Sequence, residues 1–412
     1  MENTRKLSLP AQIVIALLVG VILGLICYFA GLADFTATYL KPFGTIFVNL
    51  LKFLVVPVVL LSMIEGIVSM GDMKKVGSVG WKTVAYFLLT TAVACVIGLS
   101  VASVFNSAKL FPVLQIADGA EWSGKTNQAF MDTLVAIFPD NMFKAFANAD
   151  MLQVIVIALL LGSGILSVGR EADPIRDLVS SGYAVFDTIM SYIINLSPIG
   201  VFAMMTWVVA TQGPNILGSL AAVLLCAYIG YALHAVLVYS LSVKIFAGIS
   251  PLTFFRSAAS AMIFAFTSTS SAATLPVSKE CAAELGAQDD IASFVLPLGS
   301  TINMDGTAIY QCVATVFLAS CAGIRLSLTQ MVIIVVTATL ASIGTAGTPG
   351  AGMIMLAMVL TAMGIDVNMI MIIYGIDRLF DMGRTCLNVA GDISCACCVT
   401  CWETGMLVPR KK

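Results

Sequence analysis

The chain has 412 residues, 59% of them hydrophobic and only 11% charged, and its formal net charge is −2 at pH 7. Soluble domains carry about 25% charged residues, so this composition excludes a soluble globular protein and predicts an integral membrane protein. The charged residues cluster between long apolar runs, which marks these runs as candidate membrane spans.

Eight apolar runs reach the roughly 20 residues that a spanning helix needs. They lie near 11–30, 42–70, 81–106, 150–168, 180–211, 217–246, 290–322 and 368–400. The first run lacks the short core and cleavage site of a secretory signal, so we expect it to remain as a membrane helix. If successive runs cross the membrane in opposite directions, lysines and arginines gather at the run ends on one side of it. This pattern predicts cytoplasmic termini, and it places the polar segment 106–141 outside the cell.

Two further apolar stretches, 251–285 and 328–364, are interrupted at mid-length by TSTSSAAT (267–274) and SIGTAGTPGAG (342–352). Hydrocarbon tolerates such broken backbone only where protein or a water-filled cavity surrounds it. Each stretch therefore predicts a re-entrant hairpin of two half-helices that meet at a polar tip. A span with a polar interruption follows each hairpin, at 300–311 and at 377–392. Repeated in opposite orientations, this unit is an inverted repeat, which predicts a substrate site near the midplane.

One face of the last predicted span is polar. On a helix, six side chains fall within an arc of about 100°: Asp377, Asp381, Arg384, Thr385, Asn388 and Asp392. Such a stripe cannot face lipid, where an ionised side chain costs at least ~2.5 kcal/mol, so it predicts a protected aqueous site. A structural Asp–Arg pair that locks helices together is the alternative.

Arg384 and Asp381 have complementary chemistry for a zwitterion. The planar guanidinium fork of Arg384 binds a carboxylate, and Asp381, one turn earlier, attracts an ammonium group. Together they predict an amino acid with an anionic side chain, aspartate or glutamate. A simple dicarboxylate such as succinate is expected to leave Asp381 without a counterion.

The other polar interruption, Asn303 to Thr307, combines oxygen ligands with a glycine at which the backbone can unwind. Alkali cations prefer carboxylate, amide and carbonyl oxygens over sulfur or imidazole. We therefore expect sodium as the co-transported ion and no organic cofactor. An ordinary loop is the alternative interpretation of this segment.

At these motifs the sequence resembles the dicarboxylate/amino acid:cation symporters, the family of archaeal sodium-coupled aspartate transporters and mammalian excitatory amino acid transporters. The resemblance spans essentially the whole chain and is densest at Ser270-Ser271, 303–307, 344–352 and 381–392. It implies an all-α polytopic protein of the cell membrane that is not an enzyme. Its eight transmembrane helices and two re-entrant hairpins would form a homotrimer of elevator-type transporters.

The resemblance also implies a division into two parts. The scaffold would comprise 1–80 (helices 1–2) and 108–211 (helices 4–5 with the extracellular loop). The transport domain would comprise helix 3 at 81–107 and the segment 212–412. That segment holds helix 6, hairpin 1 at about 250–285, helix 7 at about 290–322, hairpin 2 at about 328–364 and helix 8 at about 368–405.

Site residues follow from the resemblance, position by position. The substrate residues would be Ser270, Ser271, Met304, Thr307, Thr348, Gly352, Asp381, Arg384, Thr385 and Asn388. Asp381 would hold the amine and Arg384 the side-chain carboxylate, with the second hairpin tip as the extracellular gate. The sodium ligands would be Phe87, Thr90, Thr91, Asn303 and Asp305 at one site; Gly306, Asn388 and Asp392 at a second; and Thr301, Ser342, Ile343 and Thr345 at a third.

Three positions depart from the family pattern. Thr269 stands where archaeal members have an arginine before the hairpin serines, and Phe87 replaces a tyrosine. Arg378 lies about one turn from Met382, the position that resembles the place where mammalian members carry their arginine. The charge balance of the empty carrier, and with it potassium counter-transport, depends on these arginines.

Some signals allow other interpretations. The cluster Cys395, Cys397, Cys398 and Cys401 suits helix packing or a zinc site, and His234 suits a buried structural residue or a proton relay.

At the level of function, the alternatives are a proton-coupled carrier of the same fold, an anion channel and an intramembrane aspartyl protease that uses Asp305 and Asp381. Extra charge from Arg384 and Asp392 counts against the protease, because a catalytic dyad needs two isolated acids.

Overall fold

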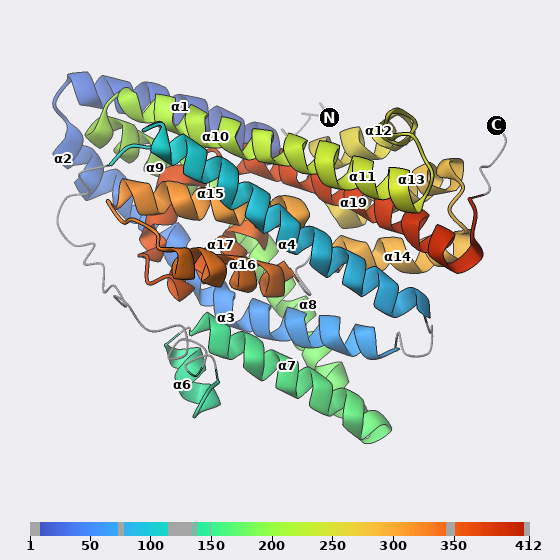
Figure 1. Ribbon diagram of the computed structural model, residues 1–412. Coiled ribbons are helices and arrows are strands. Elements are labelled where there is room, and N and C mark those ends of the chain that lie inside the picture. The colour runs from blue at the N-terminus through green and yellow to red at the C-terminus, as the bar shows by residue number, and fades with distance from the viewer. Residues whose placement is uncertain are drawn as a thin grey trace, which may run out of the picture.

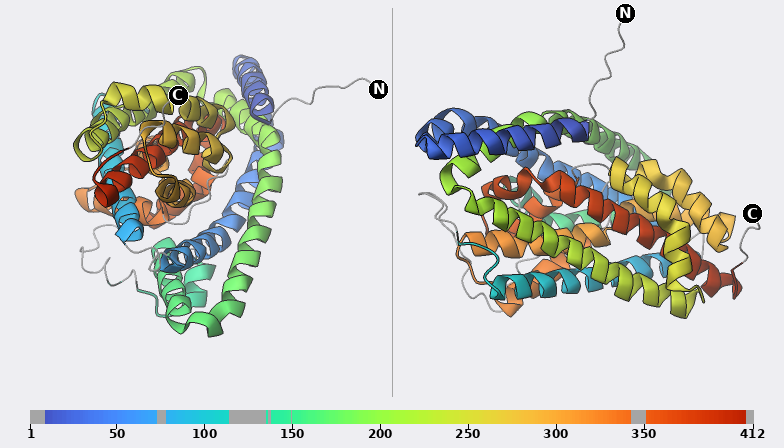
Figure 2. Two further views of the ribbon diagram at one scale, coloured as in Figure 1. Left: turned by 90° about the vertical axis from the view of Figure 1, so that its right-hand side faces the viewer. Right: turned by 90° about the horizontal axis from the view of Figure 1, so that it is seen from above.

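The computed structural model describes residues 9–72, 78–113, 135, 138–148, 150–342 and 351–407. Every regular element in these ranges is a helix, and the long helices run broadly along one direction (Figure 1). Two groups are visible end-on, a closed bundle and a wall of helices along one side of it (Figure 2, left).

The wall helices belong to the first half of the chain. Their bounds are α1 Leu9–Phe29, α2 Ala33–Phe35, α3 Lys41–Asp72, α6 Met142–Ala147, α7 Met151–Val168, α8 Asp173–Asn195 and α9 Ser197–Gln212. α1 packs along α9, and α3 packs against α7, α8 and α9. A bend of 50° separates α8 from α9, so the run predicted as one span at 180–211 consists of two helices.

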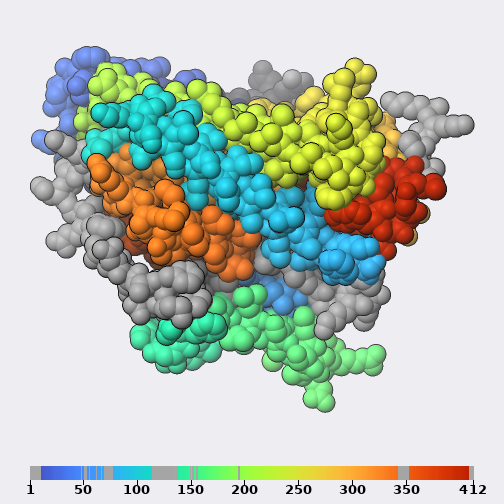
Figure 3. All heavy atoms as spheres, viewed as in Figure 1, coloured from blue at the N-terminus to red at the C-terminus, as the bar shows by residue number. Residues whose placement is uncertain are grey.

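The bundle helices comprise α4 and everything after α9. Their bounds are α4 Ser78–Ser107, α10 Asn215–His234, η4 Ala235–Tyr239, α11 Ser240–Phe246, α12 Pro251–Ser268, α13 Ser271–Leu285, α14 Asp289–Ile302, α15 Asp305–Cys321, α16 Leu328–Ser342, α17 Ala351–Ala362, α18 Ile370–Tyr374 and α19 Asp377–Thr404. α4 runs across the face seen in Figure 3, between α10 and α16.

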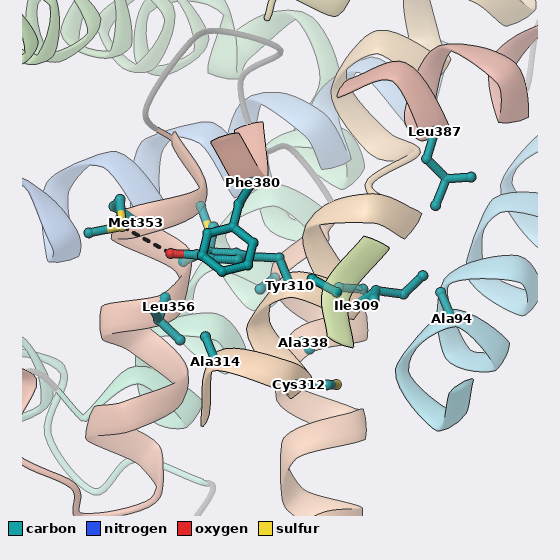
Figure 4. Close-up of a cluster of buried hydrophobic side chains, with 14 of the residues drawn as sticks. Ala94, Ile309, Tyr310, Cys312, Ala314, Ala338, Met353, Leu356, Phe380 and Leu387 are labelled. Carbon is teal, nitrogen blue, oxygen red and sulfur yellow. Dashed lines mark hydrogen bonds between the residues drawn. The ribbon is translucent and has the colours of Figure 1, made fainter. Parts of the chain in front are cut away.

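Helix α15 is the centre of the bundle, because all of its residues are buried. It contacts α4, α10, α16, α17 and α19, as expected for a helix that is apolar on every side. Figure 4 shows part of this core, where Tyr310 of α15 packs against Phe380 and donates a hydrogen bond of 3.0 Å to the sulfur of Met353. This core fixes the positions of the polar side chains around it.

The first predicted hairpin is confirmed as two half-helices, α12 and α13, which pack against each other. The turn between them lies at Thr269, whose φ of 53° is in the left-handed region. Ser270 then caps α13 by accepting a hydrogen bond from the amide of Ala273. In the second hairpin α16 and α17 also pack together, and its tip, residues 343–350, lies outside the described residues.

One of the two predicted helix interruptions is confirmed and the other is wrong. Asn303 and Met304 separate α14 from α15, as the sequence predicts. The polar run 377–392 instead lies within the unbroken helix α19, and the break comes just before it, at Gly375 and Ile376. Polar side chains do not by themselves break a helix, since those of α19 find partners in the bundle and leave the backbone hydrogen bonds intact.

By length and composition alone, four helices of the described residues are able to cross a membrane, or five if the bent pair counts as one span. They include Ser78–Ser107, Asn215–Phe246 and Asp377–Thr404. The eight predicted spans exceed this number partly because the run at 290–322 is divided between α14 and α15. Residues 1–8, 408–412 and most of 106–141 lie outside the described residues, so the orientation of the termini and of that segment stays a prediction.

Candidate functional site

The polar face of α19 is buried inside the bundle. Asp381, Arg384, Asn388 and Asp392 are each 2–3% exposed, although α19 is one of the helices long and apolar enough to span. α19 packs against α10, α12, α14 and α15. The stripe that the sequence predicts therefore faces protein rather than the outer surface.

Charged residues in the first two turns of α19 form what we call the charge cluster: Asp377, Arg378, Asp381 and Arg384. Arg384 Nε donates to Asp381 Oδ1 at 2.9 Å, and Arg378 Nη1 lies 3.4 Å from Asp381 Oδ2. Arg384 Nη1 lies 3.6 Å from Asp377 Oδ1. This brings together the acid and the arginine predicted to bind substrate, and the hydroxyl of Thr385 donates to the same Asp381 oxygen at 3.3 Å.

The start of α17, in the second hairpin, lies against the guanidinium group of Arg384. A Cβ added to Gly352, at the start of α17, would lie 1.9 Å from Arg384 Nη1, so only glycine fits there without moving the arginine. The ring of Tyr310 lies under the same group, 5.0 Å from Arg384 Cζ. Arg384 thus lies at the place where α15, α17 and α19 meet.

Asp305, the first residue of α15, is fully buried and belongs to a second group, which we call the Asp305 cluster. Thr91 Oγ1 donates to its Oδ1 at 2.6 Å, Tyr239 donates to its Oδ2 at 2.8 Å, and His234 Nε2 lies 3.0 Å from the same Oδ2. These partners come from α4, η4 and α10. The only histidine of the chain is therefore a buried partner of Asp305, and its Nδ1 has no hydrogen-bond partner in the described ranges.

Asn303, in the helix break, connects the break to α19. Its Nδ2 donates to Asn388 O at 2.7 Å and to Asp392 Oδ1 at 2.8 Å. The amide of Gly306 donates to Asn388 Oδ1 at 2.8 Å. The side chains of Asn388 and Asp392 on α19 thus bond to residues at the break, and Asp305 begins the helix that follows it.

Comparison with known proteins gives the family of the chain. A model of the sodium:dicarboxylate symporter family matches residues 9–402. The chain belongs to this family. It is 32% identical to the proton/sodium-glutamate symport protein of Geobacillus stearothermophilus over 97% of this chain and 95% of the relative. It is also 32% identical to the proton/glutamate-aspartate symporter of Escherichia coli K12 (97% and 93%) and to the C4-dicarboxylate transport protein of Bacillus subtilis 168 (93% and 91%).

The symporter is therefore a transporter of the plasma membrane and not an enzyme. The aspartyl protease interpretation of Asp305 and Asp381 is excluded. The relatives are named for glutamate, for glutamate and aspartate, or for C4-dicarboxylates.

Of the remaining predicted substrate residues of the symporter, all but Thr348 lie in the described ranges. Met304 Sδ accepts hydrogen bonds from Asn388 Nδ2 at 3.4 Å and from Thr307 Oγ1 at 3.6 Å. Ser271, next to the cap residue Ser270, is buried at the start of α13, which packs along α19. Thr348 lies outside the described residues.

Some of the predicted sodium ligands lie in the described residues and others do not. Phe87 is fully buried, and its carbonyl accepts from Thr90 Oγ1 at 3.1 Å. Thr301 is exposed and donates to the carbonyl of Leu298 at 2.9 Å. Ser342 ends α16, and Ile343 and Thr345 lie outside the described residues.

Several residues that contact the site were not among the predicted ligands. Gly299 lies against Asp392, because a Cβ there would be 2.4 Å from Asp392 Oδ1. Tyr239 and His234 hold Asp305. The sequence shows a single histidine and a glycine one turn before Asn303. Neither signal predicts which residue the side chain or backbone will contact.

All eleven cysteines of the symporter are free, and nine are buried. Cys398 and Cys401 lie near the carbonyls of Ser242 and Ala247, at 3.6 and 3.8 Å. Among the residues that the structure describes, no group of three or more His, Cys, Asp or Glu side chains is arranged to hold a metal. Burial of Cys395, Cys397 and Cys398 is what helix packing predicts for this cluster.

Proposed function

We propose that the symporter takes up acidic amino acids, L-aspartate or L-glutamate, together with sodium ions. The observation that supports this most strongly is the buried contact of Asp381 with Arg384, 2.9 Å apart, with Gly352 against the guanidinium group. A carboxylate and a guanidinium side by side match the ammonium and the distal carboxylate of such a substrate. Relatives named as glutamate and glutamate-aspartate symporters agree with this substrate class.

Sodium is the coupling ion in this proposal because the Asp305 cluster and the helix break supply oxygen ligands close to the charge cluster. Asn388, one turn after Arg384 on α19, bonds to Asn303, Met304 and Gly306 at the helix break. Binding of an ion at these oxygens would order the same helix break that contacts the substrate region. The ion therefore has a physical route by which to raise substrate affinity.

Transport by an elevator movement of the bundle helices along the wall helices, in a homotrimer, completes the proposal. Among the described residues, the most extensive contacts between the two groups are those of α3 with α17, α7 with α16 and α17, and α9 with α10 and α18. Large apolar side chains such as Leu161, Leu178 and Tyr192 are exposed on α7 and α8. They fit burial against lipid and against other copies of the chain.

The proposal is tested with purified protein in lipid vesicles. Labelled L-aspartate and L-glutamate should accumulate with an inward sodium gradient, and equal sodium on both sides should abolish accumulation. Uptake that needs a pH gradient and ignores sodium would establish the proton-coupled carrier instead. A sustained anion current without saturable uptake would establish the channel.

A further inference from the structure

Asp381 is approached by a guanidinium group on each side. Its Oδ1 accepts from Arg384 Nε at 2.9 Å and from Thr385 at 3.3 Å, and its Oδ2 faces Arg378 Nη1 at 3.4 Å. The carboxylate thus has counterions from the protein before any substrate arrives. The sequence predicts that a dicarboxylate without an amine leaves Asp381 without a counterion. The structure contradicts this prediction, because two arginines already face Asp381.

Two carboxylates and two guanidinium groups make the charge cluster neutral overall. A zwitterion does not need to supply a positive charge to such a cluster. A dianion with two carboxylates and no amine would meet a neutral site instead of a negative one.

Both arginines also keep hydrogen-bonding capacity in reserve. Arg378 Nε and Arg384 Nη1 are buried and have no hydrogen-bond partner in the described part of the chain. A buried donor without an acceptor is costly, and two such donors on neighbouring guanidinium groups suit a ligand with two carboxylates.

Arg378 is the more weakly held of the two arginines. Its contact with Asp381 is longer, 3.4 against 2.9 Å, and its side chain is 11% exposed against 3% for Arg384. Tyr310 and Gly352 confine Arg384 further. Arg378 is therefore the group that an incoming ammonium can displace from Asp381.

Helix stability does not account for Arg378. It is the second residue of α19, where the positive end of the helix dipole disfavours a cation. An acid that precedes a base along a helix is the favourable order, and Arg378 precedes Asp381. The contact therefore serves something other than the helix.

We propose that Arg378 is a specificity-determining residue that admits four-carbon dicarboxylates lacking an amine. It neutralises Asp381 in the place that a substrate ammonium takes, and it withdraws when an acidic amino acid binds. This inference rests on the proposed function, because it concerns the same substrate site.

The test measures sodium-dependent binding of L-aspartate and of succinate to wild type, Arg378→Gln and Arg378→Lys. Wild type should bind both ligands. In Arg378→Gln the dissociation constant for succinate should rise by about tenfold or more, the effect of losing a charged hydrogen-bond donor, while that for L-aspartate changes by less than about threefold. Arg378→Lys keeps the charge but not the planar guanidinium fork. Its affinity for succinate should lie between those of wild type and Arg378→Gln.

An unchanged ratio of the two affinities in Arg378→Gln overturns the inference, even if both ligands weaken together, because a purely structural arginine predicts a parallel loss. Wild type that binds L-aspartate but not succinate also overturns it and leaves the proposed function intact. Wild type that binds succinate alone would refute the amino acid proposal, and the succinate shift in Arg378→Gln would still test Arg378.

Discussion

At the scale of single residues, Arg384 is held from three directions. Asp381 accepts from its Nε, Tyr310 lies beneath its plane, and Gly352 leaves the space that its Nη1 occupies. Because the guanidinium is fixed in this way, it presents its free donor to one location only. A side chain so confined selects ligands by the position of a carboxylate rather than by charge alone.

Replacement of Arg384 by cysteine should weaken L-aspartate and L-glutamate binding by about a hundredfold, because a charged, desolvated partner is lost. Neutral amino acids such as L-serine should lose much less, since they do not need the guanidinium. Competition binding in saturating sodium measures both effects.

Arg325→Cys is the matched control for this variant, because it removes an arginine from the exposed loop after α15. Its affinities should equal those of wild type. Full aspartate affinity in Arg384→Cys would show that the guanidinium does not bind the substrate.

At the scale of helices, Asp305 joins elements that are distant in the sequence. Thr91 of α4, His234 of α10 and Tyr239 of η4 all meet this one carboxylate at the start of α15. The periodicity of the apolar residues predicts each of these helices separately. It does not predict which polar side chains will face each other, because that depends on how the helices pack.

Tyr239→Phe should raise the sodium concentration needed for half-maximal substrate binding by about threefold to tenfold. The lost hydroxyl orients Asp305, and a typical hydrogen bond contributes about 0.5–1.5 kcal/mol. The measurement is a sodium titration of L-aspartate binding.

Tyr86→Phe is the matched control, since Tyr86 is another buried tyrosine, whose hydroxyl lies 2.9 Å from Ser242 and 2.8 Å from Ser394. It should cost similar thermal stability and leave the sodium titration unchanged. Equal sodium shifts in the two variants would mean that Asp305 does not bind sodium.

At the scale of the whole molecule, the bundle and the wall meet at definite side-chain contacts. One of them is Phe47 of α3 against Tyr374 of α18, with ring centroids 4.6 Å apart. Another is Gly375, where a Cβ would lie 2.5 Å from Met205 of α9. If the bundle moves along the wall during transport, both contacts must separate in every cycle.

A cross-link between Phe47→Cys and Tyr374→Cys should therefore abolish uptake while sodium-dependent substrate binding persists. The reagent is a short thiol-reactive linker, with the cross-link verified by mass spectrometry and uptake measured in vesicles. The two single variants, treated identically, control for reaction at native cysteines. Uptake at the wild-type rate in cross-linked protein would contradict the elevator proposal.

The sequence by itself determined the membrane environment, the two half-helices of the first hairpin, the break at Asn303 and the placing of Asp381 and Arg384 on one face of a helix. These features follow from composition and from the 3.6-residue period, which are properties of neighbouring residues. Only the tertiary structure decided that α19 is unbroken, that Gly299 lies against Asp392, that His234 and Tyr239 hold Asp305, and that Arg378 reaches Asp381. Most of these contacts join residues far apart in the chain, and the others depend on side-chain directions and on surrounding partners, so packing rather than local pattern selects them.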